Sequence, residues 1–507
     1  MKVEHIDVLI IGAGLSGVGA ACHLQDKCPK REFAVLEARD CVGGTWDLFR
    51  YPGVRSDSDM FTLGYAFRPW TATKSIADGQ AILRYVRDTA RERGIEDRIR
   101  FNHRLRRASW SSRDGRWTVE ADSGPSRQPV YMSCNFLLAC CGYYSYAEGY
   151  APQFPGIARY KGRLVHPQNW TADVEYAGKR VVVIGSGATA VTLVPEIAKS
   201  AAGVTMLQRS PTYVVAWPDE DRIANALRRW LPAKTACALT RWKNVAAGIY
   251  FYRLCKRDPE RAKAMILEGV RSALGPNYDV ATHFTPRYNP WDQRLCLAPN
   301  GDFFQSIREG RTTIVTDEIE TFVERGLKLR SGRQLDADLV ITATGLNLQV
   351  LGGAELAIDG GSVDPATTLS YKGVLYSDIP NLASVLGYTN ASWTLKADLI
   401  SGYVCRLLNY MDRHGYVHCT PRNTDPTIER LPPVDFSSGY FQRAIDKLPR
   451  QGSRKPWRIH QNYLLDLMDL RLARFDDGVL EFASRSPAPA GRESTRADAA
   501  SEASGAL

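Results

Sequence analysis

The sequence lacks the closely spaced cysteine pairs that many redox and metal proteins use. Its 507 residues include 11 cysteines, but none forms a Cys-x-x-Cys pair, and the only adjacent couple is Cys140 and Cys141. An odd number of thiols with such spacings fits neither a zinc site nor a disulfide framework. The absence also argues against redox proteins that pass electrons to paired cysteines. We therefore expect reduced structural thiols and no metal.

Long apolar runs are absent too. No stretch reaches the roughly 18 uncharged apolar residues that a membrane-spanning helix needs. A signal peptide is not expected, since Asp7 and a glycine-rich loop stand where its apolar region would lie. The hydrophobic content of 44% is that of a globular protein. These features predict a cytoplasmic protein, and the length predicts about two to four domains.

A glycine-rich loop follows the first apolar run, at residues 8–11. Its sequence is Gly12-Ala13-Gly14-Leu15-Ser16-Gly17, and a helical pattern comes after it. In a strand, turn and helix, such a loop lets the backbone approach a pyrophosphate, which the helix N-terminus then binds. Glu37 ends the next strand, where an acid accepts hydrogen bonds from ribose hydroxyls and repels a 2′-phosphate. This loop predicts binding of FAD or NAD, with NADP disfavoured.

A second loop repeats this arrangement later in the chain. The buried run 180–184 leads into Gly185-Ser186-Gly187-Ala188-Thr189-Ala190, and a helix is expected from Val191. Arg209 and Ser210 end the following strand, and a guanidinium beside a hydroxyl matches a 2′-phosphate. This loop predicts NADPH binding. One such loop is weak evidence, but two loops in strand, turn and helix context are much stronger.

The two loops predict an α/β fold with two Rossmann-like dinucleotide-binding domains and a helical insert. We expect the first part of the FAD-binding domain at 1–150 and the NADP-binding domain at 151–215 and 276–345. The chain then returns to the FAD domain and its C-terminal part at 346–483. Residues 484–507 have too few large apolar side chains to fold.

The insert at 216–275 carries almost the whole charge imbalance of the chain. Between residues 222 and 275 there are twelve Lys and Arg against three acids, an excess of nine within a net charge of +10. Asp258 and Pro259 predict the start of a helix that ends near Gly275. The favoured interpretation is that basic amphipathic helices roof the substrate pocket, which Trp291 and Trp393 also shape. Alternatively, they rest on anionic lipid at the inner face of the membrane. Nucleic acid is not an expected partner.

Two further segments resemble the Baeyer-Villiger monooxygenases, a family of flavoproteins. Residues 44–57, which include Gly44, Trp46 and Asp57, resemble the family's G-x-W-x4-Y-P-G-x3-D signature. Residues 160–170 resemble its F-x-G-x3-H-x3-W fingerprint, with Tyr160 in place of Phe and with Gly162, His166 and Trp170 retained. Residues 289–296 and 387–398 also look almost unchanged. The resemblance extends over about residues 5 to 485.

The resemblance implies roles for particular residues. Arg294 would be the cation that stabilises an anionic oxygen species and the tetrahedral adduct of a ketone. Asp57 would lie near the flavin and orient Arg294. His166 would be a hinge and positioning residue with Trp170, and not a general base. The resemblance places Ser16, Glu37, Thr45, Trp46, Asp47, Leu48 and the backbone near Leu105 around FAD, and Arg55, Ser56 and Asp57 near the nicotinamide cofactor.

The leading hypothesis is therefore an FAD- and NADPH-dependent monooxygenase. Its substrates would be molecular oxygen and a small apolar ketone or sulfur compound, giving an ester, a lactone or an S-oxide. An alternative is an N-hydroxylating or S-oxidising flavin monooxygenase without Baeyer-Villiger activity, although such enzymes usually carry Tyr or Phe at the position of Trp170. An alternative of another class is a flavin redox sensor or membrane-surface module.

Overall fold

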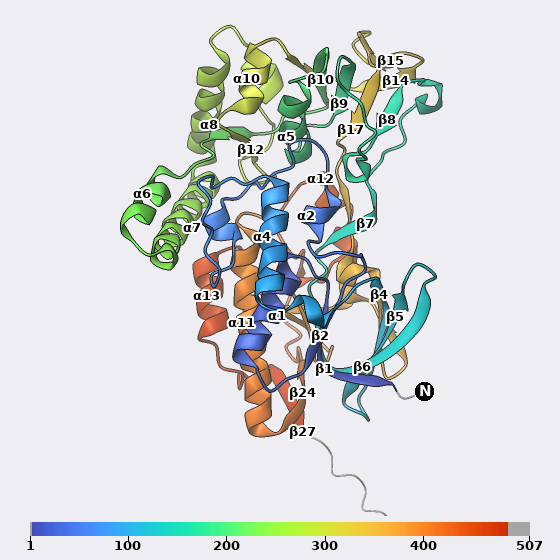
Figure 1. Cartoon of the computed structure of the whole chain (residues 1–507), viewed down its shortest axis with the longest axis vertical. Coiled ribbons are helices and arrows are strands. Elements are labelled where there is room, and N and C mark those ends of the chain that lie inside the picture. Colours follow the sequence, from blue (N-terminus) through green and yellow to red (C-terminus); the bar gives the residue numbers. More distant parts are fainter. Residues whose placement is uncertain (1–2, 485–507) are drawn as a thin grey trace, which may run out of the picture.

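The computed structural model describes residues 3–484, and its two sheets form two units joined by a pair of linkers (Figure 1). The tail predicted at 484–507 lies outside the described residues from 485 onward. Within 3–484, no helix is long and apolar enough to cross a membrane. No cluster of three or more His, Cys, Asp or Glu side chains in that range could hold a metal ion.

The first unit is built on an 11-stranded sheet. Its centre is β1 (Glu4–Ile11), which pairs in parallel with β2 (Phe33–Leu36) and with β6 (Gln128–Ala139). Both faces of β1 are buried, since Val8 and Ile10 pack on the helical side and Leu9 and Ile11 pack on the opposite side. The other strands are β3 (Ile99–Arg100), β4 (His103–Ser111), β5 (Arg116–Ser123), β19 (Glu355–Ile358), β20 (Gly361–Val363), β21 (Ser370–Tyr371), β22 (Leu375–Tyr376) and β23 (Leu382–Ser384).

Helices cover the inner face of this sheet. α1 (Leu15–Lys27) packs along α11 (Trp393–His414), and α11 in turn carries α13 (Tyr463–Arg471). α11 ends at His414, where Gly415 in a left-handed conformation provides the C-cap. The remaining elements of this unit are α2 (Thr45–Leu48), α3 (Met60–Leu63), α4 (Gly79–Glu92), α12 (Gly439–Gln442), β24 (Tyr416–Pro421), β25 (Arg430–Leu431), β26 (Gln451–Gly452) and β27 (Leu480–Ser484).

The second unit has a five-stranded sheet in which every pairing is parallel. Its order is β13 (Thr312–Thr316), β10 (Gly203–Gln208), β9 (Arg180–Ile184), β17 (Leu339–Thr342) and β8 (Arg163–Val165). α5 (Ala188–Ile197) and α10 (Asp302–Arg308) pack together beside it. A small antiparallel sheet adds β14 (Ile319–Val323), β15 (Gly326–Leu329) and β16 (Gln334–Asp336). The mixed sheet of the first unit and the parallel sheet of the second, each packed against helices, confirm the predicted α/β class.

The basic insert is helical and bridges the two units. It contains α6 (Arg222–Trp230), α7 (Ala233–Arg257) and α8 (Pro259–Leu274), and α9 (Val280–Phe284) follows. As predicted, Asp258 caps α8 by accepting a hydrogen bond from the Arg261 N–H, and Gly275 ends it. Val245 of α7 packs into the core of the first unit, whereas Val270 of α8 packs into the core of the second.

Two short strands connect the units side by side. β7 (Tyr144–Gly149) leaves the first unit, and β18 (Leu346–Leu348) returns to it, pairing antiparallel with β7. A further parallel pair, β11 (Val214–Trp217) with β12 (Cys296–Pro299), closes the base of the insert. The chain thus crosses between the units through a paired linker that can act as one hinge.

Candidate cofactor and oxidation site

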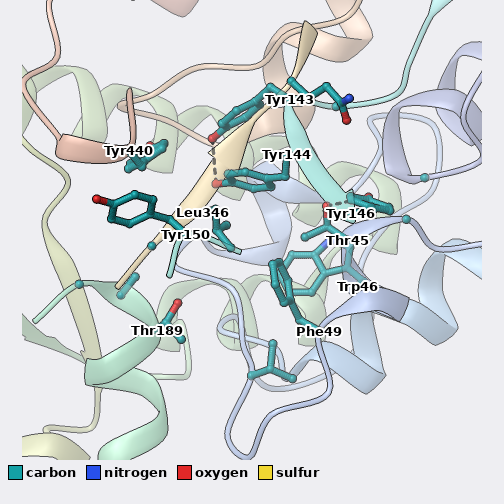
Figure 2. A pocket seen from close by; sticks show the side chains of 18 of the residues that line it. Thr45, Trp46, Phe49, Tyr143, Tyr144, Tyr146, Tyr150, Thr189, Leu346 and Tyr440 are labelled. Atoms are coloured by element: carbon teal, nitrogen blue, oxygen red, sulfur yellow. Dashed lines mark hydrogen bonds between the residues drawn. The ribbon is translucent and has the colours of Figure 1, made fainter. Parts of the chain in front are cut away.

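A cleft of about 1500 Å³ runs between the two units and reaches both glycine loops. Its walls carry residues from the first loop, the 44–57 segment, the paired linker and the second loop. Figure 2 shows that Thr45, Trp46 and Phe49 face the same space as Tyr143, Tyr144 and Tyr440. Motifs that lie far apart in the sequence therefore meet at one site.

The first loop is shaped by close backbone contacts. Gly12 has a φ of +101°, and a Cβ there would lie 2.8 Å from the carbonyl oxygen of Cys140. A Cβ on Gly17 would lie 1.7 Å from the carbonyl oxygen of Gly12, so this position admits only glycine. Gly14 is the N-cap of α1 and supplies no side-chain cap. The N–H groups of the first turn are thus free to bind phosphate oxygens.

Glu37 stands at the end of β2 and holds the loop directly. Its carboxylate accepts hydrogen bonds from the backbone N–H of Ala13 at 2.7 Å and of Arg39 at 2.9 Å. Burial raises the pKa of Glu37, although these hydrogen bonds oppose the shift. A carboxylate accepts about four hydrogen bonds, so capacity remains for ribose hydroxyls. Leu105 lines the same end of the cleft.

The second loop leaves room for a side chain at only one of its two glycines. Gly185 has a φ of +126°, and its Cβ would lie 2.3 Å from the Ala343 carbonyl oxygen, whereas a Cβ on Gly187 would meet nothing within 4 Å. Gly187 caps α5 without a side chain, as Gly14 does for α1. The Ser186 hydroxyl donates to the carbonyl oxygen of Ser210 at 3.1 Å, and Arg209 lies exposed on the cleft wall. The arrangement suits a phosphate-bearing ligand.

The segment that begins at Gly44 divides between the cleft and the interior. Gly44 lies against Gly14, and the Thr45 hydroxyl is 3.2 Å from that of Tyr146. Asp47, in contrast, does not line the cleft, because it is buried among Arg39, Arg50, Arg87 and Cys41. Burial alone would raise the pKa of Asp47, but its hydrogen bonds from Cys41 and Arg39 outweigh this and lower it. Asp47 therefore holds the loop in place from the interior, whereas Thr45 and Trp46 line the cleft.

Arg55, Ser56 and Asp57 all line the cleft. Arg55 forms an ion pair with Asp302 at 2.5 Å, and the Ser56 hydroxyl accepts from the Ser58 N–H at 2.9 Å. Burial raises the pKa of Asp57, although the charges of Arg294 and Arg55 oppose the shift. This segment thus brings to the cleft a cation that is already paired with Asp302 and a partly buried carboxyl, that of Asp57.

Arg294 is a partly buried cation on the wall of this cleft, and its Nε atom is fully buried. Its Nε finds no hydrogen-bond partner among the described residues, and no ion pair within 4.0 Å joins it to Asp57. Asp57 and Arg294 therefore form no direct ion pair and interact only through space. Burial opposes the charge, but the pKa of Arg294 is still raised, and the Asp57 carboxylate is among the groups that favour the cation. The guanidinium is a permanent charge available to a ligand.

An aromatic wall beside Arg294 was not predicted from the sequence. The hydroxyls of Tyr143 and Tyr144 lie 3.0 Å apart, and Tyr143 stacks on Trp393 with ring centroids 5.2 Å apart. Tyr440 joins them from α12 (Figure 2). Burial raises the pKa of all three tyrosines, so their hydroxyls stay protonated. The pair Tyr143-Tyr144 after Gly142 was the available signal, whereas nothing local marks Tyr440.

Several predicted residues lie outside the cleft. No residue of the insert lines it, so the expectation that the insert roofs the pocket is wrong. Trp393 lines the cleft, but Trp291 packs against Tyr252 elsewhere. Gly17, the third glycine of the first loop, faces the backbone of Gly12. Leu48 and the first residues of α5 pack against the core of the second unit. The predicted cofactor-binding residues without a place on the cleft wall are Gly17, Asp47, Leu48, Ala190 and Val191.

His166 lies at the linker and not in the cleft. Its Nε2 is 3.1 Å from the Gly345 carbonyl oxygen, and its Nδ1 accepts from the Gln168 N–H at 3.2 Å. Gly149 leaves the space for the ring, because a Cβ there would lie 2.0 Å from it. Burial lowers the pKa of His166, although its hydrogen bond to Gly345 opposes the shift. The neutral ring therefore contacts the end of β7 and the residue that precedes β18.

The other fingerprint residues surround this point. Gly162 packs against Tyr160, whose hydroxyl donates to the Ala337 carbonyl oxygen at 3.1 Å. The Trp170 ring packs on Tyr176 with centroids 6.1 Å apart. These contacts belong to the second unit, so the fingerprint connects that unit's interior to the linker.

Comparison with known proteins agrees with this geometry. Residues 74–225 match the model of the flavin-binding monooxygenase-like family, and residues 10–75 match that of an NAD(P)-binding Rossmann-like domain. FAD-containing monooxygenase EthA of Mycobacterium tuberculosis is 54% identical over 96% of this chain and 99% of its own length. EthA of Mycolicibacterium smegmatis is 50% identical over 94% of this chain and 97% of its own length.

Solved structures show the same fold at lower identity. A steroid monooxygenase bound to NADP aligns with a TM-score of 0.70 and 24% identity, covering 82% of this chain and 87% of that one. Cyclohexanone monooxygenase in an open form aligns with a TM-score of 0.69 and 19% identity, covering 83% of this chain and 90% of that one. With relatives so similar over nearly their whole length, the chain belongs to the EthA-like family of FAD-containing monooxygenases.

Proposed function

We propose that this monooxygenase uses NADPH to reduce FAD and transfers one atom of molecular oxygen to a small apolar ketone or sulfur compound. NADPH, a proton, oxygen and substrate would give NADP⁺, water and an ester, lactone or S-oxide. The observation that carries the proposal is Arg294, a partly buried cation without an ion-pair partner within the described chain, in a cleft that reaches both glycine loops. Bound FAD would supply the electron transfer and the activation of oxygen.

The residues of the first loop fit FAD. The N-terminus of α1 offers free N–H groups, Gly12 and Gly17 remove the Cβ atoms that would obstruct the turn, and Glu37 keeps acceptor capacity for ribose. We place Thr45, Trp46 and Leu105 along the same cofactor. In the second loop, Arg209 and Ser210 would contact the 2′-phosphate of NADPH.

Arg294 would stabilise negative charge where oxygen reacts. A charge held in a buried, fixed position lowers the energy of an anionic oxygen without reorganisation at the moment of reaction. The neutral hydroxyls of Tyr143, Tyr144 and Tyr440 can donate hydrogen bonds to a substrate oxygen or sulfur, and the aromatic rings exclude water. Asp57 would adjust the local field through its charge. His166 and Trp170 would couple movement of the second unit to the linker.

The direct test is incubation with NADPH, oxygen and a panel of ketones, amines and sulfides. We expect ester or lactone from ketones and S-oxide from thioamides or sulfides, each one oxygen heavier by mass spectrometry. Oxidised amines or sulfides with no ester from any ketone would instead establish the N-hydroxylating or S-oxidising alternative. NADPH oxidation without any oxygenated product would contradict the proposal.

We also propose that the insert and α13 rest on anionic lipid at the inner face of the membrane. Fourteen large apolar side chains are exposed in the described chain, and ten of them lie on helices α6 to α8 or at α13. On α7, Leu239, Trp242 and Tyr250 recur along the outward face, where a soluble helix would carry polar residues. The other seven of the ten are Ile223, Trp230, Met265, Leu464, Leu465, Met468 and Leu472.

Charge favours lipid over a second copy of the chain at this surface. Trp242 and Tyr463 pack with ring centroids 5.8 Å apart, which makes the faces of α7 and α13 continuous. Exposed cations flank this face, among them Arg222, Arg229 and Lys234. In a symmetric dimer the same positive patch would face itself, whereas anionic lipid would attract it.

Flotation with vesicles of phosphatidylglycerol and phosphatidylcholine tests this surface. We expect binding at low salt, loss of binding at high salt, and loss in the Trp230→Ser/Trp242→Ser variant. Tyr131→Ser, an exposed site on β6, is the matched control and should float as the wild type does. Absence of flotation, or a dimer in solution that the double variant dissociates, would overturn the lipid proposal.

A further inference from the structure

A buried ion pair lies behind the cleft, between two helices of the first unit. Lys396 of α11 and Asp466 of α13 approach to 3.1 Å, and each side chain is only 3% exposed. The same carboxylate oxygen of Asp466 accepts a hydrogen bond from the hydroxyl of Tyr388 at 2.6 Å. The Lys396 ammonium also lies over the Tyr388 ring, 5.2 Å from its centroid. The three side chains thus form one closed polar cluster.

Stability alone does not account for this cluster. Moving two charges out of water costs several kcal/mol per ion, and an apolar replacement of a buried pair is often neutral or stabilising. α13 could be held by apolar packing instead, since Tyr463 and Leu470 already bury their side chains. The feature that an apolar replacement would lose is the fixed position of the Tyr388 hydroxyl.

Tyr388 begins a loop that forms the flavin side of the cleft. Tyr388, Ala391 and Trp393 line the cleft. The next residues are held by Gln461, which lies just before α13. The Gln461 side-chain oxygen accepts a hydrogen bond from the Thr389 N–H at 3.2 Å, and the Gln461 carbonyl oxygen accepts one from the Asn390 side chain at 2.9 Å. One end of the 388–393 loop is therefore anchored to residues 461–466.

The other end of the loop reaches the first glycine loop. The indole N–H of Trp393 donates to the hydroxyl of Ser16 at 2.7 Å, and its ring stacks on Tyr143. The Ser392 hydroxyl lies 2.6 Å from that of Thr62. A shift of the loop at Tyr388 would therefore move a side chain that contacts both the phosphate-binding turn and the aromatic wall.

We infer that Lys396 and Asp466 are positioning residues that act through Tyr388 to hold Trp393 against Ser16 and Tyr143. The inference rests on the proposed FAD site. They contribute to the affinity for FAD and to coupling. Coupling is the fraction of the oxidised NADPH that is used to form oxygenated product. Neither residue lines the cleft, so neither touches cofactor or substrate.

The test replaces the whole cluster with apolar side chains in the variant Tyr388→Phe/Lys396→Met/Asp466→Leu. No buried polar group is then left without a partner, so the melting temperature should not fall. We expect the Kd for FAD, measured by flavin fluorescence, to rise about tenfold, and coupling to fall at least about twofold. The matched control is Lys455→Met, which removes an exposed ion pair to Asp469 on the same α13.

A triple variant that keeps the wild-type melting temperature, FAD affinity and coupling would overturn the inference. If that variant fails to fold, Tyr388→Phe decides, since it keeps the ion pair. It should raise the Kd for FAD and lower coupling in the same direction, and wild-type values in Tyr388→Phe would overturn the inference. Failure of the proposed function looks different, because the wild-type protein itself would then bind no FAD or form no oxygenated product.

Discussion

Arg55 and Asp302 form an ion pair that joins the two units. Arg55 belongs to the segment after α2, and Asp302 is the first residue of α10, so the 2.5 Å contact ties the first unit to the second. The Arg55 side chain is only 13% exposed. Because Arg55 also lines the cleft, the pair fixes a cleft residue relative to the partner unit.

Asp302→Asn should lower the free energy of unfolding by about 1 to 3 kcal/mol, because a largely buried guanidinium loses its charged partner. Asparagine keeps an oxygen for the Phe303 N–H, so α10 should still form. Denaturant titration measures the loss. Glu196→Gln, which breaks an exposed pair with Lys199, is the control and should cost less than about 0.5 kcal/mol. Equal losses would show that the Arg55 pair is no stronger than a surface pair.

Arg294→Ala should lower product formation by about 100-fold or more while FAD binding stays unchanged. The reason is that the variant removes the fixed charge facing the reacting oxygen. NADPH oxidation should continue, with hydrogen peroxide released in place of oxygenated product. Product analysis with a parallel peroxide assay measures both. Arg253→Ala, on the exposed side of the insert, should behave as the wild type, and normal ester yield from Arg294→Ala would refute the proposed role.

Local sequence predicted the parts of the site that depend on local geometry. Gly12, Gly17 and Gly185 occupy positions where a Cβ would meet backbone, and such a requirement is readable from a strand, turn and helix pattern. The start of α8 could likewise be predicted from local sequence, because Asp258 caps the helix and Pro259 occupies its first position. Arg294, by contrast, was identified through family resemblance, since nothing in its own neighbourhood distinguishes a buried cation from a surface arginine.

Tertiary packing decided the features that were missed. Asp47 follows the cleft-lining residues Thr45 and Trp46 in the sequence, but its ion pairs with three arginines hold it in the interior. Tyr440 reaches the cleft from α12, more than 290 residues after Tyr144, and no local pattern encodes that approach. The insert was expected to cover the pocket. Its charge pattern shows which helix faces are exposed to solvent, but it does not show which part of the protein the opposite faces pack against.

Gly187→Ala should raise the KM for NADPH by about tenfold or more without unfolding the protein. A Cβ at this position meets no atom within 4 Å, so the fold has room for it, yet it would stand where the backbone approaches the pyrophosphate. Steady-state kinetics and the melting temperature measure the two effects. Gly185→Ala is the comparison and should lose stability, since its Cβ would collide with Ala343. An unchanged KM in Gly187→Ala would remove the second loop from NADPH binding.

His166→Gln should destabilise the protein by an amount that shrinks as the pH falls from about 7.5 to 5.5. Burial lowers the pKa of His166 below its ordinary value near 6.5, so in this range the unfolded chain takes up a proton that the folded chain does not. The stability contributed by the neutral ring is therefore complete above about pH 6.5 and is lost as the pH decreases. His283 and His418, whose pKa values burial also lowers, occur in both proteins and cancel in the comparison. Denaturant titrations of both proteins at several pH values measure the difference between their free energies of unfolding. A difference that stays constant or increases toward low pH would show that His166 is not held neutral at the linker.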